Sequence, residues 1–190
     1  MSLFENYKFY LDDDDRQTTL RDLLIRPAKV SDSQELGIIQ AEREGGVSAI
    51  HAVKIEQAIN SWTKTSQGII LVAKYDNKLV GLAKIKYFSP APASPSNAAP
   101  AGWYLSGVIV RSKYRRCGVG QALTQARLEW ITARASCAYY FANAQNQVSI
   151  ALHNKFGFKE LTRDFTHPGV TFTGGVGILF GADLTQGKSA

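Results

Sequence analysis

The chain has 190 residues, with 22 Lys and Arg against 16 Asp and Glu, which gives a formal net charge of +6. Hydrophobic residues make up 45% of it, a share that is ordinary for one packed globular domain and excludes a mainly disordered chain. No uncharged apolar run approaches the roughly 18 residues that span a bilayer. The first six residues have no basic region followed by an apolar stretch, so we expect no secretory signal. Two cysteines are too few for a disulfide scaffold. We therefore expect a cytoplasmic protein with no membrane partner.

Charge is unevenly distributed along the chain. Residues 1–22 hold six acids against three bases, and the run from Asp12 to Asp15 should be solvated because like charges repel. The remaining 19 bases and 10 acids suggest an anionic partner. These bases do not alternate with aromatic residues, so the pattern does not predict nucleic-acid binding. We expect an acidic arm over residues 1–22, part of which could dock, a single domain over 23–184 and a polar tail over 185–190.

Hydrophobic periodicity predicts an α/β chain built on a mixed sheet. The expected strands cover residues 23–26, 69–73, 79–85, 103–110, 138–142, 159–165 and 176–184. The first expected helix follows a cap at Ser31 or Asp32, and the others cover about 48–62, 118–135 and 149–156. Asp76 and Asn77 fit a hairpin turn because both tolerate positive φ.

A proline-rich segment interrupts this pattern. The stretch from Ser89 to Pro100 carries four of the six prolines and no charge, so it can form neither a regular strand nor a helix. Loops of this length inside a compact domain are often functional. A solvated linker of variable sequence is the equal alternative.

The most informative segment is a basic turn between the strand that ends at Val110 and the helix that begins near Gly118. Gly118 and Gly120 have no Cβ, so a bulky anion can approach the backbone closely. The amides of residues 116–121 and the helix dipole would together form an anion site. The surrounding bases are Arg111, Lys113, Arg115 and Arg116. A diphosphate is the expected ligand, although the turn lacks the lysine of a Walker P-loop and the third glycine of a Rossmann turn.

Two motifs carry a family resemblance. Arg115-Arg116-Cys117-Gly118-Val119-Gly120 has the form Arg-x-x-Gly-x-Gly, and here the sequence resembles the GNAT (general N-acetyltransferase) superfamily, whose members bind the pyrophosphate of coenzyme A with this motif. The segment from Asn146 to Phe158 resembles the family's Asn-x-x-[Ala/Ser]-x-x-[Leu/Phe]-[Tyr/His]-x-[Lys/Arg]-x-Gly-Phe pattern. With the order of elements, the resemblance covers residues 23–184. It implies the GNAT fold: a mixed, mostly antiparallel sheet of about six to seven strands, splayed between the fourth and fifth, flanked by about four helices.

The resemblance implies acetyl-CoA as the cosubstrate, with its pantetheine arm in the gap between the splayed strands. Asn146 matches the family residue that hydrogen-bonds the pantetheine. The implied cofactor-binding residues are Val108, Ile109, Val110, Arg115, Arg116, Cys117, Gly118, Val119, Gly120, Gln121, Asn146 and Ser149. Cys117 would act through its backbone rather than as a nucleophile. We expect no metal, because the three histidines lie far apart in the sequence, and we interpret His51 and His167 as surface or partly buried polar residues.

The resemblance also implies direct attack by the amine in a ternary complex, without an acyl-enzyme. An amide near Val108 would polarise the thioester carbonyl. His153 stands where the family most often has a tyrosine acid, but it could instead pack on its short helix. The base is open among four side chains and a water relay to backbone carbonyls. The four candidate bases are Glu42, Glu44, Tyr104 and Tyr87. The residues that we select as catalytic are His153 as the acid, together with Tyr104 and Glu42.

We therefore expect an amino-group N-acetyltransferase, an acyltransferase whose acceptor is a small-molecule primary amine. The 89–100 loop would rim the acceptor pocket, and its lack of charge argues against a highly cationic acceptor. The alternative is a non-catalytic module of the same fold that binds coenzyme A as a sensor or structural ligand. Nucleic-acid binding would rest on charge alone, and a homodimer stays open.

Overall fold

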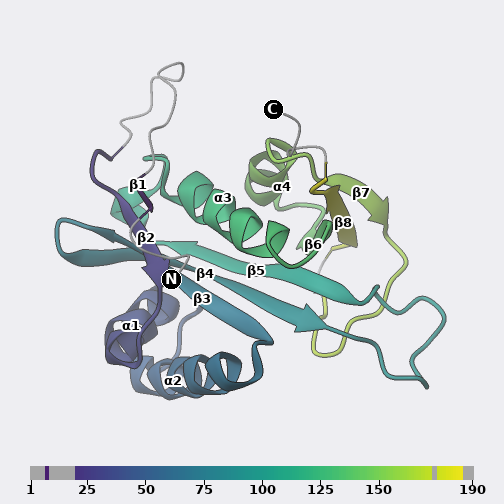
Figure 1. The fold of residues 1–190 in the computed structure, drawn as a ribbon, viewed down its shortest axis with the longest axis horizontal. Helices are drawn as coiled ribbons and strands as arrows, with labels where there is room; N and C mark the ends of the chain where they lie inside the picture. Colours follow the sequence, from purple (N-terminus) through teal and green to yellow (C-terminus); the bar gives the residue numbers. More distant parts are fainter. Residues whose placement is uncertain (1–6, 9–19, 173–174, 186–190) are drawn as a thin grey trace. The chain divides into compact units, whose positions relative to one another are not determined.

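The computed structural model describes residues 7–8, 20–172 and 175–185 (Figure 1). The acidic run from Asp12 to Asp15 and the tail beyond residue 185 lie outside these ranges. The order of strands in the sheet is β1-β2-β3-β4-β5-β6-β8-β7. The chain divides into two compact units. One unit holds the described residues up to Ile85 and Gly107–Arg127, and the other holds Lys86–Ser106 and the residues from Leu128 onward.

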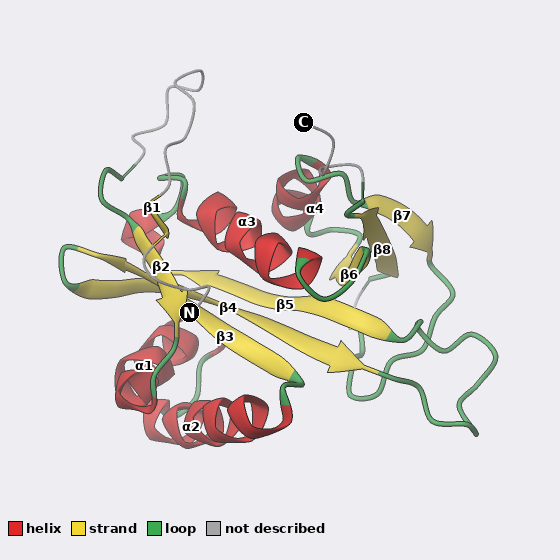
Figure 2. Cartoon of the chain, viewed as in Figure 1, coloured by secondary structure: helices red, strands yellow, loops and turns green. Residues whose placement is uncertain are grey.

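The first unit combines antiparallel strands with helices on both faces of the sheet. Its elements are β1 (Tyr7–Lys8), β2 (Leu24–Pro27), α1 (Ser33–Glu44), α2 (Ser48–Thr65), β3 (Gly68–Tyr75), most of β4 (Lys78–Phe88), the end of β5 (Gly102–Val110) and most of α3 (Val119–Thr132). Strand β2 pairs antiparallel with β1 and with β3. Figure 2 shows α1 and α2 side by side on one face of these strands and α3 on the other.

Strand β3 supplies side chains to both cores of this unit, because successive residues of a strand point to opposite faces. Ile70 and Val72 pack against buried leucine and isoleucine side chains of α1 and α2. Leu71 packs in the other core with Leu123 of α3. Leu123 is fully buried, so its truncation to alanine should cost about 2–5 kcal/mol of stability.

Local sequence explains two turns of the first unit. Asp76 and Asn77 have φ of 48° and 58°, as expected for the hairpin that joins β3 to β4. Asp32 is the N-cap residue of α1, but its side chain makes no capping hydrogen bond to that helix. Its carboxylate instead accepts hydrogen bonds from the Arg26 guanidinium at 2.7 and 2.9 Å and from the Lys29 amide at 2.7 Å, and α1 begins one residue later at Ser33.

The second unit carries the parallel strand pair. It contains the end of β4, the first part of β5, the end of α3, β6 (Cys137–Asn143), α4 (Gln147–Asn154), β7 (Lys159–Thr162) and β8 (Gly177–Asp183). Strand β5 runs parallel to β6, with Tyr104 opposite Tyr139. Strand β8 pairs antiparallel with β6 and β7, and the register with β7 shifts between Glu160 and Thr162.

The fold class expected from the sequence is confirmed. The sheet is mixed and, within the described residues, is flanked by four α-helices. The parallel pair is β5 and β6, which are the fourth and fifth of the expected strands. The numbers differ by one because β1 comes from the arm, where no strand was expected. Strand β7 ends at Thr162 rather than at residue 165, since the chain then leaves β8 and Thr166 bridges to Ala98. No helix among the described residues is long and apolar enough to cross a membrane.

Candidate functional site

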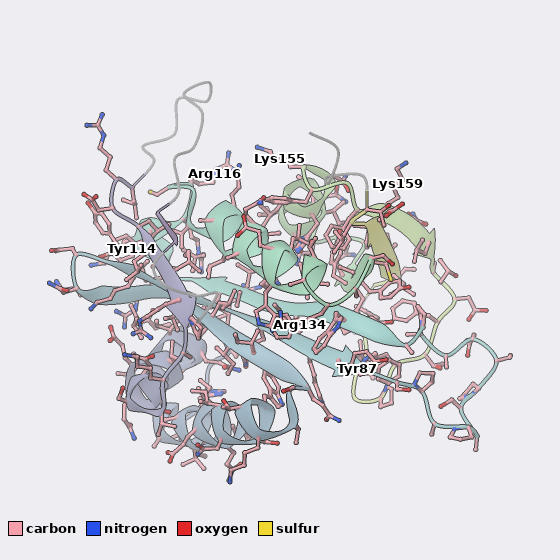
Figure 3. All side chains as sticks on the ribbon, in the orientation of Figure 1. Tyr87, Tyr114, Arg116, Arg134, Lys155 and Lys159 are labelled. Atoms are coloured by element: carbon pink, nitrogen blue, oxygen red, sulfur yellow. The ribbon has the colours of Figure 1, made fainter. Side chains whose placement is uncertain are left out.

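The predicted diphosphate turn lies in the first unit, between β5 and α3. The Arg111 amide donates to the Val80 carbonyl at 2.9 Å and fixes the end of β5 against β4. The backbones of Arg116 (φ 61°) and Gly118 (φ 77°) are left-handed and turn the chain toward α3, beside which Figure 3 labels Arg116. The first α-helical bond runs from the Ala122 amide to the Gly118 carbonyl at 3.0 Å. The amides just before Ala122 therefore have no acceptor within the helix.

Cationic side chains surround this turn. Arg115 and Arg116 are both exposed, and Arg115 Nε donates to the Val110 carbonyl at 3.2 Å. Lys113 Nζ lies 4.8 Å from the centre of the Tyr114 ring. A helix N-terminus adds roughly half a positive charge. The arrangement has the open backbone, the amide donors and the charge that a diphosphate needs.

The apolar residues predicted to bind the cofactor have side chains that pack in the cores, so a contact with a cofactor would have to come from their backbones. Ile109 and Val119 are buried in the two cores of the first unit, and Val108 and Val110 pack partly against one of them. Gly107 has φ 54°, and nothing lies within 4 Å of the position where a Cβ would stand. This left-handed residue interrupts the regular strand just before Val108.

The remaining turn residues have ordinary structural partners. Cys117 Sγ lies 3.4 Å from the Arg115 carbonyl, so the thiol donates to the turn itself. Gly120 and Gln121 form the first turn of α3 and are half-buried. The Gly120 carbonyl accepts a hydrogen bond from Thr124 Oγ1 at 2.9 Å.

Glu42, a candidate base, is paired with Arg111. The Arg111 guanidinium lies 3.2 Å from a Glu42 oxygen and 3.8 Å from Glu35 Oε1, and Glu35 Oε1 also accepts the Leu79 amide at 3.1 Å. A cavity of about 40 Å³ is lined by residues of this region, including Glu42, Arg111 and Arg115. The pair links α1 to the residue that precedes the diphosphate turn.

Among the other base candidates, Tyr104 and Glu44 make hydrogen bonds, and Tyr87 makes a ring contact. Tyr104 is 3% exposed and donates its hydroxyl hydrogen to the Pro100 carbonyl at 2.7 Å, and burial raises the pKa of this phenol well above its usual range. Tyr87, labelled in Figure 3, meets the Trp103 ring edge-on at 5.1 Å. Glu44 accepts a hydrogen bond from Gln40 Nε2 at 2.9 Å.

The second predicted motif begins and fills α4. Asn146 caps the helix, since its Oδ1 accepts the Ser149 amide at 3.2 Å. The Ser149 carbonyl accepts from Nδ1 of His153 at 2.8 Å, and this assigns a hydrogen to Nδ1. The His153 ring is 4% exposed and stacks on Tyr140 at 4.0 Å between ring centres, with Phe158 at its edge. His153 is thus part of the core of the second unit.

Sequence reasoning did not foresee that two long loops of the second unit would be joined (Figure 1). The Ala99 amide donates to the Thr166 carbonyl and the Thr166 amide to the Asn97 carbonyl, both at 2.9 Å. Asn97 Nδ2 also donates to Asp164 at 2.7 Å. These bonds adjoin His167, whose ring lies in an aromatic cluster with Phe88, Tyr104 and Phe141. Residues 89–100 contain no aromatic residue, so their sequence did not indicate this contact.

A cavity of about 330 Å³ in the second unit contains none of the predicted site residues. It lies between α4 and the β7–β8 pair, with Ile150, Phe158 and Phe180 among its lining and Arg163 beside Glu160. The ion pair between Arg163 and Glu160, which belongs to this lining, is exposed to solvent. Among the described residues, no group of three His, Cys, Asp or Glu side chains is placed to hold a metal ion.

The comparison with protein families agrees with the turn and the fold. The model of the acetyltransferase (GNAT) family matches residues 36–158. The chain belongs to this family of acetyltransferases. No curated protein sequence matches the chain significantly.

The chain is similar to solved structures with the same fold, and each match covers nearly the whole of the solved chain. An acetyltransferase of the GNAT family from Streptococcus pneumoniae has a TM-score of 0.66 and 19% identity, over 86% of this chain and 99% of that one. A ribosomal-protein-alanine N-acetyltransferase from Brucella melitensis has a TM-score of 0.65 and 23% identity, over 85% and 99%. PaiA N-acetyltransferase from Thermoplasma acidophilum, solved with coenzyme A, has a TM-score of 0.63 and 15% identity, over 85% and 99%.

Proposed function

We propose that the protein transfers an acetyl group from acetyl-CoA to the primary amine of a small molecule. The observation that carries this proposal is the turn from Arg115 to Gly120, in which a left-handed Gly118 and exposed arginines precede the amides of the α3 N-terminus. Such a turn suits the diphosphate of coenzyme A. The structures of PaiA with coenzyme A and of YncA from Salmonella typhimurium with acetyl-CoA, which share the fold, support the choice of cosubstrate.

The proposed reaction is a direct attack in a ternary complex. The acceptor must first lose a proton, because an ammonium has no lone pair. Its nitrogen then bonds to the thioester carbon, and an amide at Val108, beside the left-handed Gly107, stabilises the negative oxygen. The carbon–sulfur bond breaks, the second amine proton leaves, and the thiolate gains a proton to give coenzyme A.

The individual roles follow the motifs. Backbone amides of the turn would bind the diphosphate, with Arg115 and Arg116 adding charge, and the amide side chain of Asn146 would face the pantetheine. His153 is proposed to protonate the thiolate from Nε2 of its doubly protonated ring, since the hydrogen on Nδ1 is donated to the Ser149 carbonyl. The hydrogen bond from Nδ1 to the Ser149 carbonyl holds the ring in one orientation, which supports this role. The burial of the ring supports an additional role in packing.

A screen of amines tests the proposal. Purified protein is mixed with acetyl-CoA and a panel of primary amines, amino acids and peptides, and free thiol is measured together with the mass of the acetylated product. The proposal expects thiol release that depends on a small-molecule amine. Peptide acetylation alone would contradict the acceptor class, and acetyl-CoA binding without turnover on any amine would favour the non-catalytic alternative.

A further inference from the structure

The cavity of about 330 Å³ between α4 and the β7–β8 pair lies wholly within the second unit. Its volume falls at the lower end of the roughly 300–1,000 Å³ that is typical of small-molecule sites. None of the residues predicted to bind acetyl-CoA or to act in the reaction lines it. The cavity therefore has the size for a small ligand of its own.

The floor of this cavity is apolar. Ile178 and Phe180 lie two residues apart on β8, so their side chains point to the same face of the sheet. Ile150 adds an aliphatic side chain from α4, and Phe158 lies between α4 and β7. Phe158, Ile178 and Phe180 are each at most 4% exposed, so the floor is packed core. An apolar group that rests on it is removed from water, which favours binding.

The floor also belongs to the aromatic layer that holds His153. The ring of Phe180 stacks on Tyr140 at 4.6 Å between centres, and Tyr140 stacks on His153 at 4.0 Å. Phe158 meets the His153 ring edge-on at 5.5 Å. A ligand that contacts Phe158 is therefore separated from the imidazole by a single side chain, and the resonances of His153 can report on the cavity.

The rim of the cavity carries one uncompensated positive charge. Lys159, the first residue of β7, is exposed, and in the described part of the chain no acid forms an ion pair with it. Arg163 is the other cation of the lining, and its guanidinium donates to both carboxylate oxygens of Glu160 at 2.8 and 3.1 Å. The charge left to attract a ligand is therefore that of Lys159, which favours an anion.

An amide side chain of the lining complements this cation. Asn154 ends α4, and Asn154 and Lys159 stand on either side of the turn in which the Gly157 amide bonds the Asn154 carbonyl at 3.1 Å. The Asn154 side chain is exposed, and no described residue hydrogen-bonds its amide. An ammonium and an amide N–H are both donors to a carboxylate, and a charged partner makes such a hydrogen bond stronger.

We propose that this cavity binds a small monocarboxylate whose apolar body has the size of one aromatic ring. The carboxylate lies at Lys159 and Asn154, and the body rests on the floor beside Phe158. Charge complementarity selects an anion over a neutral molecule of the same shape, and the limited volume restricts the size of the body. This binding site goes beyond the proposed acetyl transfer and does not depend on it.

The test uses phenylacetate as the probe, with 2-phenylethanol as a neutral analogue and acetate as an analogue without the ring. Lys159→Gln removes the cation, and Lys155→Gln is its matched control, because Lys155 is an exposed lysine that does not line the cavity (Figure 3). Ile150→Trp fills the cavity, and Val148→Trp adds the same ring at a 75% exposed position of the same helix. Binding is measured by calorimetric titration and by NMR shifts, folding by melting temperature, and self-association by light scattering.

We expect the wild type to bind phenylacetate with a Kd of about 1 mM or lower. The resonances of residues 158–160 and 178–180 and of the His153 ring should shift, whereas those of residues 115–120 should not. Lys159→Gln should weaken binding at least about fivefold, and Ile150→Trp should abolish it. Both control variants should bind as the wild type does, and both analogues should bind at least about tenfold more weakly. Saturating acetyl-CoA should not displace phenylacetate.

Several results would overturn the proposal. These are absence of binding at about ten times the expected Kd, and shifts confined to other parts of the chain. Equal binding of 2-phenylethanol, or undiminished binding by Lys159→Gln, would refute an anionic ligand, and equal binding of acetate would refute the role of the floor. Displacement by acetyl-CoA would assign the cavity to the cosubstrate. Dimers of the wild type that Ile150→Trp dissociates would make a second copy the occupant. Because Lys159 is exposed, its variant keeps the test decisive if Ile150→Trp does not fold.

Discussion

The guanidinium of Arg111 lies 3.2 Å from a carboxylate oxygen of Glu42, although the two residues are 69 positions apart in the chain. Arg111 also begins the basic turn, because it directly follows Val110, the last residue of β5. Its amide donates a hydrogen bond to the Val80 carbonyl of β4. The Glu42 side chain is 46% exposed, and that of Arg111 is 20% exposed. Glu42 is therefore placed to orient a cation beside the diphosphate turn.

Glu42→Gln separates this positioning role from that of a base. If the carboxylate orients Arg111, the variant should bind acetyl-CoA at most about fivefold more weakly, which corresponds to the roughly 0.2–1 kcal/mol of an exposed ion pair, and kcat should be unchanged. If Glu42 were the base, kcat would fall by about 10²–10⁴-fold with unchanged acetyl-CoA affinity. Glu56→Gln, on an exposed position of α2, is the control for loss of one negative charge.

Gly120→Asp tests where the diphosphate binds. Gly120 lies in the first turn of α3 with no left-handed backbone, so aspartate fits the conformation. A carboxylate at a helix N-terminus favours the helix by about 0.3–1 kcal/mol, and the fold should be kept. The same charge should repel a diphosphate and lower acetyl-CoA affinity at least about tenfold, or 1.4 kcal/mol. Calorimetric titration measures this effect beside Gly120→Ala, which adds a methyl group without charge and should weaken acetyl-CoA binding less than aspartate does. Equal affinity in both variants would mean that the phosphates bind elsewhere.

Arg116→Gly probes the left-handed residue of the turn. A side chain at φ 61° costs roughly 1–2 kcal/mol, and glycine relieves this cost but loses more backbone entropy on folding. We expect a net stabilisation of up to about 1 kcal/mol in denaturant unfolding, together with weaker acetyl-CoA binding because a cation is lost. Arg115→Gly is the matched control, since Arg115 is extended with φ −70° and should lose stability on the same change. Destabilisation of both variants alike would argue against a left-handed turn at Arg116.

His153→Phe keeps the ring that stacks on Tyr140 and removes both nitrogens. If His153 protonates the thiolate, kcat should fall about tenfold to a hundredfold, at the low end of general acid catalysis because the thiolate is already a tolerable leaving group. The melting temperature and acetyl-CoA affinity should change little. His153→Ala should in addition lose about 3 kcal/mol of stability, since it leaves a cavity in the core. A folded His153→Phe protein with the wild-type kcat would leave His153 with a packing role alone.

Local chemistry made part of the site predictable. Glycines, arginines and the change from an apolar strand to a helix sufficed for the turn at Gly118, because an anion site at a helix N-terminus is formed by a few consecutive residues. The second motif marked Asn146 as a residue that hydrogen-bonds the pantetheine, and this role stays a prediction. The motif does not indicate that Asn146 also caps α4. This capping is a local contact, in which Oδ1 of Asn146 accepts a hydrogen bond from the amide of Ser149.

The rest depends on contacts between distant segments. Whether His153 is exposed or stacked on Tyr140 is decided by how α4 packs on β6, and periodicity does not fix that. The environment of His167 arises because hydrogen bonds join residues 97–99 to 164–166, two loops without a regular pattern. Sequence alone therefore indicated a surface or partly buried histidine, and could not indicate its aromatic neighbours.

The most direct test of the account is the melting temperature of the protein with and without acetyl-CoA. Ligand at about 100 times its dissociation constant should stabilise the folded state by roughly 2.7 kcal/mol. For a chain of this size that corresponds to a rise of about 5–10 °C, at roughly 2–4 °C per kcal/mol. The rise should depend on ligand concentration and be absent in Gly120→Asp. A melting temperature that saturating acetyl-CoA leaves unmoved would contradict the proposal that this protein uses acetyl-CoA.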